Sequence, residues 1–155
     1  MNLAQAKSIA QEIVARLKPH CQRIEIAGSI RRGKSWVRDI DIVLIPQNQG
    51  RLAMELVSMG KFKANGRKVA RLEYKGIPVD FYFATPDTWA TLLLIRTGSA
   101  GHNRKLASLA KRRGWHLYAD GKGLFDNQGT RIAGDSEESF FQALGIPYLE
   151  PAKRN

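Results

Sequence analysis

Two aspartates stand close together in the sequence, as Asp39-Ile40-Asp41, at the start of an apolar run that continues to residue 45. Side chains of a β-strand alternate between its two faces, so both carboxylates would point to one side and the isoleucines to the other. Two like charges side by side raise each other's pKa unless a cation lies between them. The pair therefore indicates either a solvated strand end or part of a cation site.

A third carboxylate, Asp80, lies inside a second apolar segment, residues 77–83, that is rich in β-forming residues. If this segment pairs with the strand that contains Asp41, three carboxylates converge. Oxygen ligands gathered in this way suit Mg²⁺, and two such ions can hold both oxygens of an in-line phosphoryl displacement. The sequence therefore predicts a site for metal-dependent phosphoryl transfer.

The segment before the aspartates has the features of an anion-binding loop. Residues 23–27 alternate as a strand, and Gly28 lets the backbone approach a ligand closely. We expect Ser29 to cap a short helix whose N–H groups face an anion. Arg31 and Arg32 would add charged hydrogen-bond donors.

Residues 28–35 also fit another phosphate-binding pattern, the P-loop consensus G-x-x-x-x-G-K-S, directly after a strand. That consensus requires a substantial helix after Lys34 and Ser35. The chain reaches the next predicted strand within a few residues, which is too short a distance for such a helix. A P-loop enzyme would lose activity on Lys34→Ala and keep it on Asp41→Ala, which is the opposite of our expectation.

Charge indicates the class of partner. The 155 residues include 25 Lys and Arg against 14 Asp and Glu, which gives a net charge of +11. Such a field attracts polyanions, and nucleic acid is the usual one. The single cysteine, Cys21, excludes an internal disulfide and fits a reducing compartment. We see no signal peptide and no apolar stretch of membrane-spanning length, so we expect a cytoplasmic protein without a membrane partner.

Hydrophobic spacing predicts an α+β fold in two parts. The first part, residues 1–85, combines a mixed sheet with helices on one face, and its hairpin turns at Asn65-Gly66. The second part, residues 86–155, is a small α/β subdomain whose polar tail from Pro151 is expected to fray. The predicted helices span residues 3–17, 52–59, 89–97 and 99–113, with a last helix capped by Asp135 or Ser136.

Several motifs resemble, in the right order, those of the family X DNA polymerases, the polymerase beta-like nucleotidyltransferases. The matching segments are Gly28-Ser29-Ile30-Arg31-Arg32-Gly33, then Asp39-Ile40-Asp41, then Val79-Asp80-Phe81. Residues 97–103 are similar to the family's T-G-S-x-x-H-N nucleotide-binding segment, and residues 123–125 and 137–148 resemble the end of its last domain. The aspartates alone would be shared with many other nucleotidyltransferases, but this match runs over nearly the whole chain.

The resemblance implies a nucleotidyltransferase palm followed by a C-terminal nucleotide- and DNA-binding subdomain. It implies transfer of a nucleoside monophosphate from a dNTP to a primer 3′-hydroxyl, with release of pyrophosphate. Asp39 and Asp41 would hold two Mg²⁺ ions, for which Mn²⁺ can substitute, and Asp80 would bind the ion at the 3′-oxygen. The nucleotide-binding residues implied in the same way are Gly28, Ser29, Arg32, Thr97, Gly98, Ser99 and Asn103.

The predicted helix 99–113 contains five basic residues. Most charge runs are no more than a solvated helix face, but the total charge here is lopsided. We therefore expect these residues to contact the phosphates of a DNA strand. They are Arg104, Lys105, Lys111, Arg112 and Arg113.

Two positions depart from the family pattern. Arg38 stands where the polymerase beta type has a glycine, next to the first aspartate. Ile95 and Arg96 stand where the family commonly has an aromatic pair, or His-Phe, directly before T-G-S. That backbone and ring crowd the ribose 2′ position, so we expect weaker selection of dNTP over rNTP here.

The expected role is short-gap filling in base-excision DNA repair by a monomer. Only one helix precedes the palm and no metallo-phosphoesterase domain follows, so neither lyase nor proofreading activity is expected of this chain. A template-independent nucleotidyltransferase would use the same three carboxylates. A non-catalytic basic DNA-binding module would share the charge but would have no reason to bring three carboxylates together.

Overall fold

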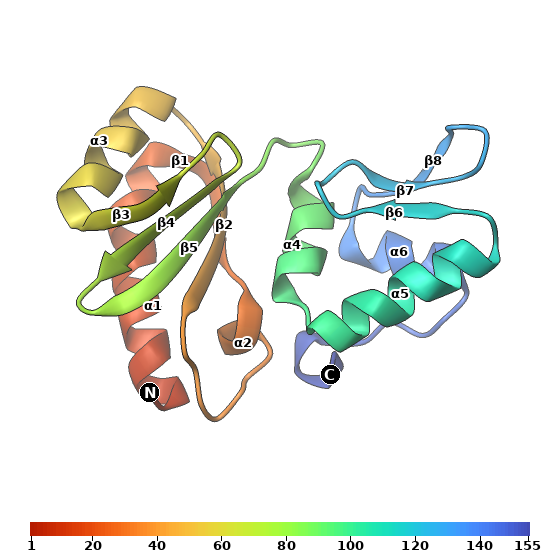
Figure 1. The fold of residues 1–155 in the computed structure, drawn as a ribbon, viewed down its shortest axis with the longest axis horizontal. Coiled ribbons are helices and arrows are strands. Elements are labelled where there is room, and N and C mark those ends of the chain that lie inside the picture. Colours follow the sequence, from red (N-terminus) through yellow and green to blue (C-terminus); the bar gives the residue numbers. More distant parts are fainter.

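Alternating apolar residues build a mixed five-stranded sheet in the first part of the chain. The computed structural model describes all of residues 1–155, and the sheet forms the core of one of its two lobes (Figure 1). Its strands run in the order β1-β2-β5-β4-β3, with β2 and β5 parallel and the other pairs antiparallel. The strands are β1 (Cys21–Ile26), β2 (Ile40–Pro46), β3 (Lys61–Asn65), β4 (Val69–Tyr74) and β5 (Ile77–Phe83).

Two helices, α1 (Leu3–Leu17) and α3 (Gln49–Met59), cover one face of this sheet. Their apolar stripes pack on the inward-facing strand residues and form one core with Ile42 and Phe81, which are fully buried. Residues next to these in sequence point to the other face of the sheet. That face therefore receives Asp41 and Asp80.

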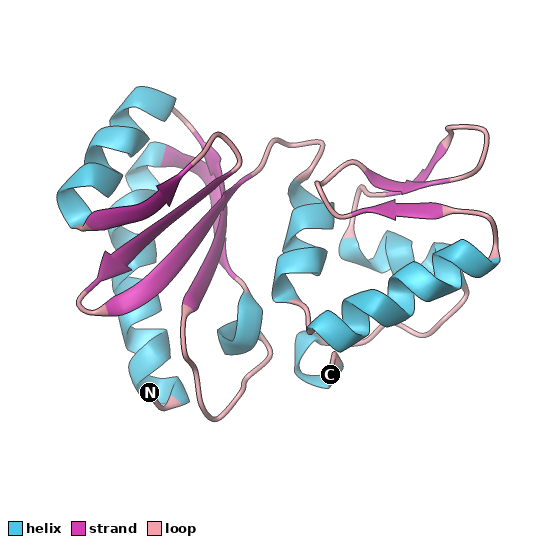
Figure 2. Ribbon diagram, in the orientation of Figure 1, coloured by secondary structure: helices cyan, strands magenta, loops and turns pink.

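The second lobe begins with α4 (Trp89–Thr97), which packs against the other face of the sheet through Trp89, Leu92 and Leu93. The two long helices of the first part therefore lie on one face of the sheet, as predicted, and α4 of the second lobe covers the other face beside β2. The rest of the lobe sets a small antiparallel sheet against two helices (Figure 2). Its elements are α5 (Ala100–Arg112), β6 (His116–Tyr118), β7 (Gly123–Phe125), β8 (Arg131–Ala133) and α6 (Glu137–Leu144).

Two local predictions were wrong. The short helix α2 (Gly28–Arg31) begins after Ala27 without any side-chain cap, so Ser29 lies inside the helix instead of capping it. The tail does not fray: residues 151–153 form a 3₁₀ turn, and Arg154 is fully buried. An arginine is buried only where its charge is met, and Arg154 donates to the Glu137 carboxylate at 2.7 Å.

The P-loop pattern lacks the helix that its consensus requires. Residues 33–39 form no helix before β2 begins, so nothing after Lys34 and Ser35 could serve as the phosphate-facing helix of a P-loop. The exclusion of that pattern therefore agrees with the structure. None of the helices combines the length and the apolar character that a membrane-spanning helix needs.

Candidate active site

The parallel pairing of β2 with β5 places two of the aspartates side by side. Asp41 and Asp80 are register partners, and Asp39 lies directly before β2. Burial, followed by the negative charges of Asp39 and Asp80, raises the pKa of Asp41 to about 7. The predicted pairing of the two strands is therefore confirmed, and it brings the three negative charges close enough to act on one another.

Asp41 has one hydrogen-bond donor, the hydroxyl of Tyr82, at 3.3 Å. Burial and the negative charge of Asp41 raise the pKa of Tyr82, so its hydroxyl keeps its proton and can donate. The guanidinium of Arg96 lies over the Tyr82 ring, 4.2 Å from its centroid. The sequence predicts that Arg96 lies near the ribose. In the structure, Arg96 also contacts Tyr82, the residue that donates to Asp41.

Asp80 is held differently, by Arg71 on the neighbouring strand β4. The Nε of Arg71 donates to Oδ1 of Asp80 at 2.5 Å, and the second nitrogen donates to Oδ2 at 2.7 Å. This hydrogen bonding raises the pKa of Arg71, so its guanidinium stays positively charged. Both oxygens of Asp80 therefore already have a cationic partner.

As they stand, no three Asp, Glu, His or Cys side chains of the chain are arranged to hold a metal ion. The donor set nevertheless suits a hard divalent cation, because it consists of carboxylate oxygens only. Burial is the main cause of the raised pKa of Asp41, the charges of Asp39 and Asp80 add to it, and the positive charge of Arg96 offsets it only in part, so a divalent cation would be well placed to offset the rest. The assignment of Asp39, Asp41 and Asp80 as metal ligands stays a prediction.

Gly28 brings the predicted phosphate-binding loop, residues 28–32 (called the phosphate loop below), against the carboxylates. Its φ of +62° is one that side chains disfavour, and a Cβ at this position would collide with the carboxylate of Asp41. The loop and the start of β2 can therefore approach only because residue 28 is glycine. This close approach would put a phosphate bound at α2 next to the metal-ligand candidates.

The loop also joins the two lobes. Arg32 donates to the carbonyl of Thr97 at 2.5 Å, and Arg31 donates to the hydroxyl of Thr97 at 2.8 Å. Arg31 further forms an ion pair with Glu137 at 2.6 Å. The predicted nucleotide-binding residues of both lobes thus meet at Thr97, although residues 32 and 97 are far apart in the sequence.

The segment after Thr97 is shaped by its own hydrogen bonds. Ser99 caps α5 by accepting from the N–H of His102, and Asn103 donates to the carbonyl of Ile95 at 2.8 Å. The Oδ1 of Asn103 and the Nε of Arg32 are buried without a partner. Buried polar atoms without partners are uncommon in folded proteins, and these two are available to a ligand.

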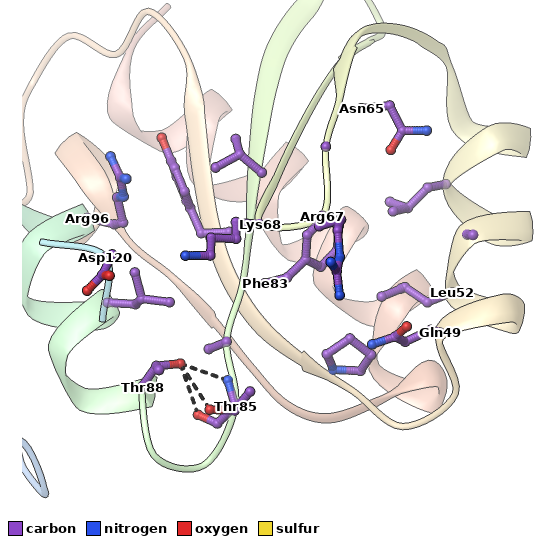
Figure 3. A pocket seen from close by; sticks show the side chains of 18 of the residues that line it. Gln49, Leu52, Asn65, Arg67, Lys68, Phe83, Thr85, Thr88, Arg96 and Asp120 are labelled. Carbon is purple, nitrogen blue, oxygen red and sulfur yellow. Dashed lines mark hydrogen bonds between the residues drawn. The ribbon is translucent and has the colours of Figure 1, made fainter. Parts of the chain in front are cut away.

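A pocket of about 830 Å³ lies between the lobes. Figure 3 shows Lys68 extending from the turn between β3 and β4 toward the side where Arg96 and Asp120 lie. Its lining includes four basic residues and one acidic one among many apolar side chains. The basic residues are Arg67, Lys68, Arg96 and Lys122, and the acidic one is Asp120.

The basic residues of α5 are exposed, as a DNA-contacting surface requires. Arg113 differs from the others because it donates to the carbonyl of Ala143 at 2.6 Å and lies over the ring of Trp115. It therefore has a structural role beside any contact with DNA. The assignment of DNA contacts to the other residues of α5 stays a prediction.

Sequence reasoning missed Arg71, Tyr82 and the pairing of Glu137 with Arg31 and Arg154. Each acts across strands or lobes, so no local pattern marks it. In the structure, burial alternates along β4 and leaves Arg71 exposed. Only the register of β4 with β5, which pairs Arg71 with Asp80, identifies its partner.

Comparisons with known proteins agree with this arrangement. A family model described as the DNA polymerase beta thumb matches residues 92–155. The chain is 29% identical to the DNA polymerase/3'-5' exonuclease PolX of Bacillus subtilis, over 96% of this chain and 27% of that protein. It is 28% identical to DNA polymerase lambda of Rattus norvegicus, over 83% of this chain and 28% of that protein. The chain thus spans less than a third of the length of these relatives.

A solved structure of polymerase beta from Leishmania infantum, in a ternary P/T complex, has the same fold. Its TM-score is 0.81 at 20% identity, and the alignment covers 100% of this chain and 76% of that one. The predicted fold class, a mixed-sheet α+β domain followed by a small α/β subdomain, is confirmed. The boundary at residues 85 and 86 stays a prediction.

Proposed function

Because the chain belongs to the family X DNA polymerases, we propose that it transfers a nucleoside monophosphate from a dNTP to a primer 3′-hydroxyl. One observation carries the proposal: Asp41 and Asp80 are register partners on parallel strands, directly beside the phosphate loop that ends at Arg32. Phosphoryl transfer needs positioning and charge stabilisation more than covalent chemistry by the protein. A cluster of carboxylates beside a basic loop meets that need.

Each residue has a role in this proposal. Asp39 and Asp41 would hold two Mg²⁺ ions or Mn²⁺ in their place, and Asp80 would join them on the side of the primer 3′-oxygen. Such cations supply charge stabilisation and lower the pKa of an oxygen bound to them. Tyr82 orients Asp41 by donating to it.

The nucleotide would lie where the two lobes meet. The N–H groups of α2 and the free Nε of Arg32 would receive the triphosphate. The buried Oδ1 of Asn103 would accept from the base, while Gly98 and Ser99 shape the backbone beside the sugar. Glycines 28 and 98 both have positive φ, which lets the backbone approach the ligand from either lobe.

DNA is the proposed partner, and the net charge of +11 supports it. We place the enzyme in short-gap filling during base-excision repair, acting as a monomer in a reducing cytoplasm. Template-independent transfer is the second candidate, because Asp39, Asp41 and Asp80 would serve both reactions. Extension of a labelled primer with and without a template strand distinguishes the two.

The test is primer extension on gapped DNA by Asp39→Asn, Asp41→Asn and Asp80→Asn variants. Each change removes one ligand charge at nearly constant volume, so each should lower incorporation by several orders of magnitude while fold and DNA binding persist. Asp135→Asn is the matched control, because its carboxylate is 93% exposed and far from the site in sequence. Near-normal extension by any of the three variants would overturn the assignment of the active site.

A further inference from the structure

Asp80 and Arg71 form a two-point ion pair in which the carboxylate is buried, unlike an ordinary surface ion pair. The Asp80 side chain is 5% exposed, and each of its two oxygens accepts a separate N–H of one guanidinium, at 2.5 and 2.7 Å. Such two-point pairs are the strong form of charge-assisted hydrogen bond. The free protein therefore presents Asp80 as an arginine-bound carboxylate.

The two partners differ in their freedom to move. Asp80 is a fully paired residue in the middle of β5, between β2 and β4, and its side chain is buried. The Arg71 side chain is 51% exposed and lies at the surface of β4. Arg71 can leave the pair by rotating its side chain into solvent, whereas Asp80 cannot.

We propose that Arg71 is a positioning residue that occupies the metal-binding side of Asp80 in the free protein and moves off when Asp80 joins a divalent cation. The inference rests on the proposed function, because it concerns a ligand of that site.

A nucleic-acid phosphate is the natural acceptor for the released guanidinium. Arginine binds phosphate through the same two-point geometry that it uses with carboxylates. A primer whose 3′-end lies at Asp80 brings its own phosphates to this face of the sheet. Binding of primer and binding of cation at Asp80 would then favour each other, and the coupling must be reciprocal.

Mn²⁺ titration of the free protein, followed by electron paramagnetic resonance, tests the first step. Arg71→Met removes the charge but keeps an unbranched side chain, and it should tighten Mn²⁺ binding about tenfold, the scale of one charge-assisted pair. Lys63→Met is the matched control, since Lys63 lies on the adjacent strand in an exposed pair with Glu73, and it should leave Mn²⁺ binding unchanged. Unchanged or weaker binding by Arg71→Met would overturn the inference.

A second variant keeps the test decisive if Arg71→Met folds poorly. Arg71→Lys retains the charge but cannot donate to both oxygens at once, so its Mn²⁺ affinity should lie between those of the unmodified protein and Arg71→Met. Adding Asp80→Asn to either variant should remove the gain in affinity. A gain that survives Asp80→Asn would contradict a role through Asp80.

Fluorescence anisotropy with a hairpin DNA that has a recessed 3′-end tests the coupling. At constant ionic strength, Mn²⁺ should tighten DNA binding by the unmodified protein and by Lys63→Met, but not by Arg71→Met. Equal coupling in all three proteins would overturn the inference. Failure of the proposed function has a different signature, namely Mn²⁺ binding that none of the substitutions at Asp39, Asp41 and Asp80 affects.

Discussion

Asp41 carries the clearest electrostatic conflict among the residues of the site. Its carboxylate is largely buried, faces the charges of Asp39 and Asp80, and has only the Tyr82 hydroxyl as a donor. At pH values below its pKa of about 7, a proton relieves this conflict. A divalent cation would relieve it equally well, so protons and metal ions should compete at this residue.

The pKa of Asp41 predicts an unusual dependence of stability on pH. Between about pH 4 and about pH 7 the folded chain keeps a proton that the unfolded chain has lost, so stability falls as pH rises through this window. The slope from one such group is at most about 1.4 kcal/mol per pH unit. Thermal unfolding in a chelator should show Asp41→Asn gaining stability over the unmodified protein as pH rises.

Comparing the two proteins isolates Asp41 from other titrating groups. Glu137 acts in the opposite sense: burial alone would raise its pKa, but hydrogen bonds from Arg31 and Arg154 outweigh burial and lower it. The stability that Glu137 contributes to the folded state is lost as pH falls. This loss is the same in the unmodified protein and in Asp41→Asn. Parallel stability profiles for the unmodified protein and Asp41→Asn would refute the prediction.

Arg96 offers a separate prediction on sugar choice. Its guanidinium lies over the ring of Tyr82, and its Nε is buried without a partner, so this nitrogen can donate to a ribose hydroxyl. Bulk alone rejects a hydroxyl weakly, whereas a polar contact with that hydroxyl can reverse the preference. Arg96→Phe should raise the preference for dGTP over rGTP about tenfold, measured by competition on a single-nucleotide gap opposite C.

Arg96→Met serves as the control for this substitution, because it removes the donors without adding a ring. If the guanidinium attracts the ribose hydroxyl, Arg96→Met should show part of the increase in dGTP preference that we expect of Arg96→Phe. If only the added ring excludes rGTP, Arg96→Met should show no increase. Strong dNTP selection by the unmodified protein, unaltered in Arg96→Phe, would rule out a role for Arg96 in sugar choice.

At the scale of elements, local patterns in the sequence predicted the type and position of single helices and strands. They did not predict the side-chain contacts between elements. Apolar spacing in residues 3–17 and turn chemistry at Asn65-Gly66 are properties of single segments, and α1 and the β3–β4 hairpin agree with them. The family motifs likewise predicted a phosphate-binding role for the loop around Gly28, which stays a prediction. The tail was misjudged because its polar composition conceals Arg154, whose partner Glu137 lies in another element.

Glu137 links three elements, and its removal should be costly. It accepts from Arg31 of α2 at 2.6 and 2.8 Å, and from the fully buried Arg154 at 2.7 Å. Glu137→Ala leaves a buried arginine without a counter-charge, which typically costs about 3–5 kcal/mol. We expect a loss of this size in the free energy of unfolding, measured by urea denaturation.

Asp135→Ala is the control for Glu137→Ala, because it also removes an acidic partner of an arginine near the start of α6. Its pair with Arg131 is exposed at the carboxylate and should contribute little. Equal unfolding free energies for the two variants would show that the Glu137 pairs are as weak as surface pairs.

At the scale of the molecule, two lobes meet along α4, and the site is shared between them. Apolar side chains of α4 pack on the sheet, while Arg31 and Arg32 reach across to Thr97. The sequence predicted both halves of the nucleotide site separately. Their meeting could not be predicted from periodicity, because it depends on the direction in which α4 crosses the sheet.

The net charge of +11 is distributed over both lobes, and DNA affinity should reflect this. Binding that neutralises phosphates weakens linearly in log–log form as salt rises, with a slope of about 0.9 per neutralised phosphate on duplex DNA. We expect a steep slope for the unmodified protein, measured by fluorescence anisotropy on gapped duplex. A DNA affinity that does not change with salt concentration would mean that Lys and Arg side chains do not bind the phosphates.

Substitution of Lys111 and Arg112 tests whether α5 contributes to this salt dependence. Changing both to Ala should lower the slope by about 0.9 for each phosphate that the protein no longer neutralises. Arg113 is left intact, because its interactions with Ala143 and Trp115 would confuse loss of charge with loss of structure. The control is Lys7→Ala with Arg51→Ala, which removes the same charge from exposed sites on α1 and α3, on the opposite face of the sheet. If both double variants lower the slope equally, DNA binding follows total charge, and α5 has no special part in it.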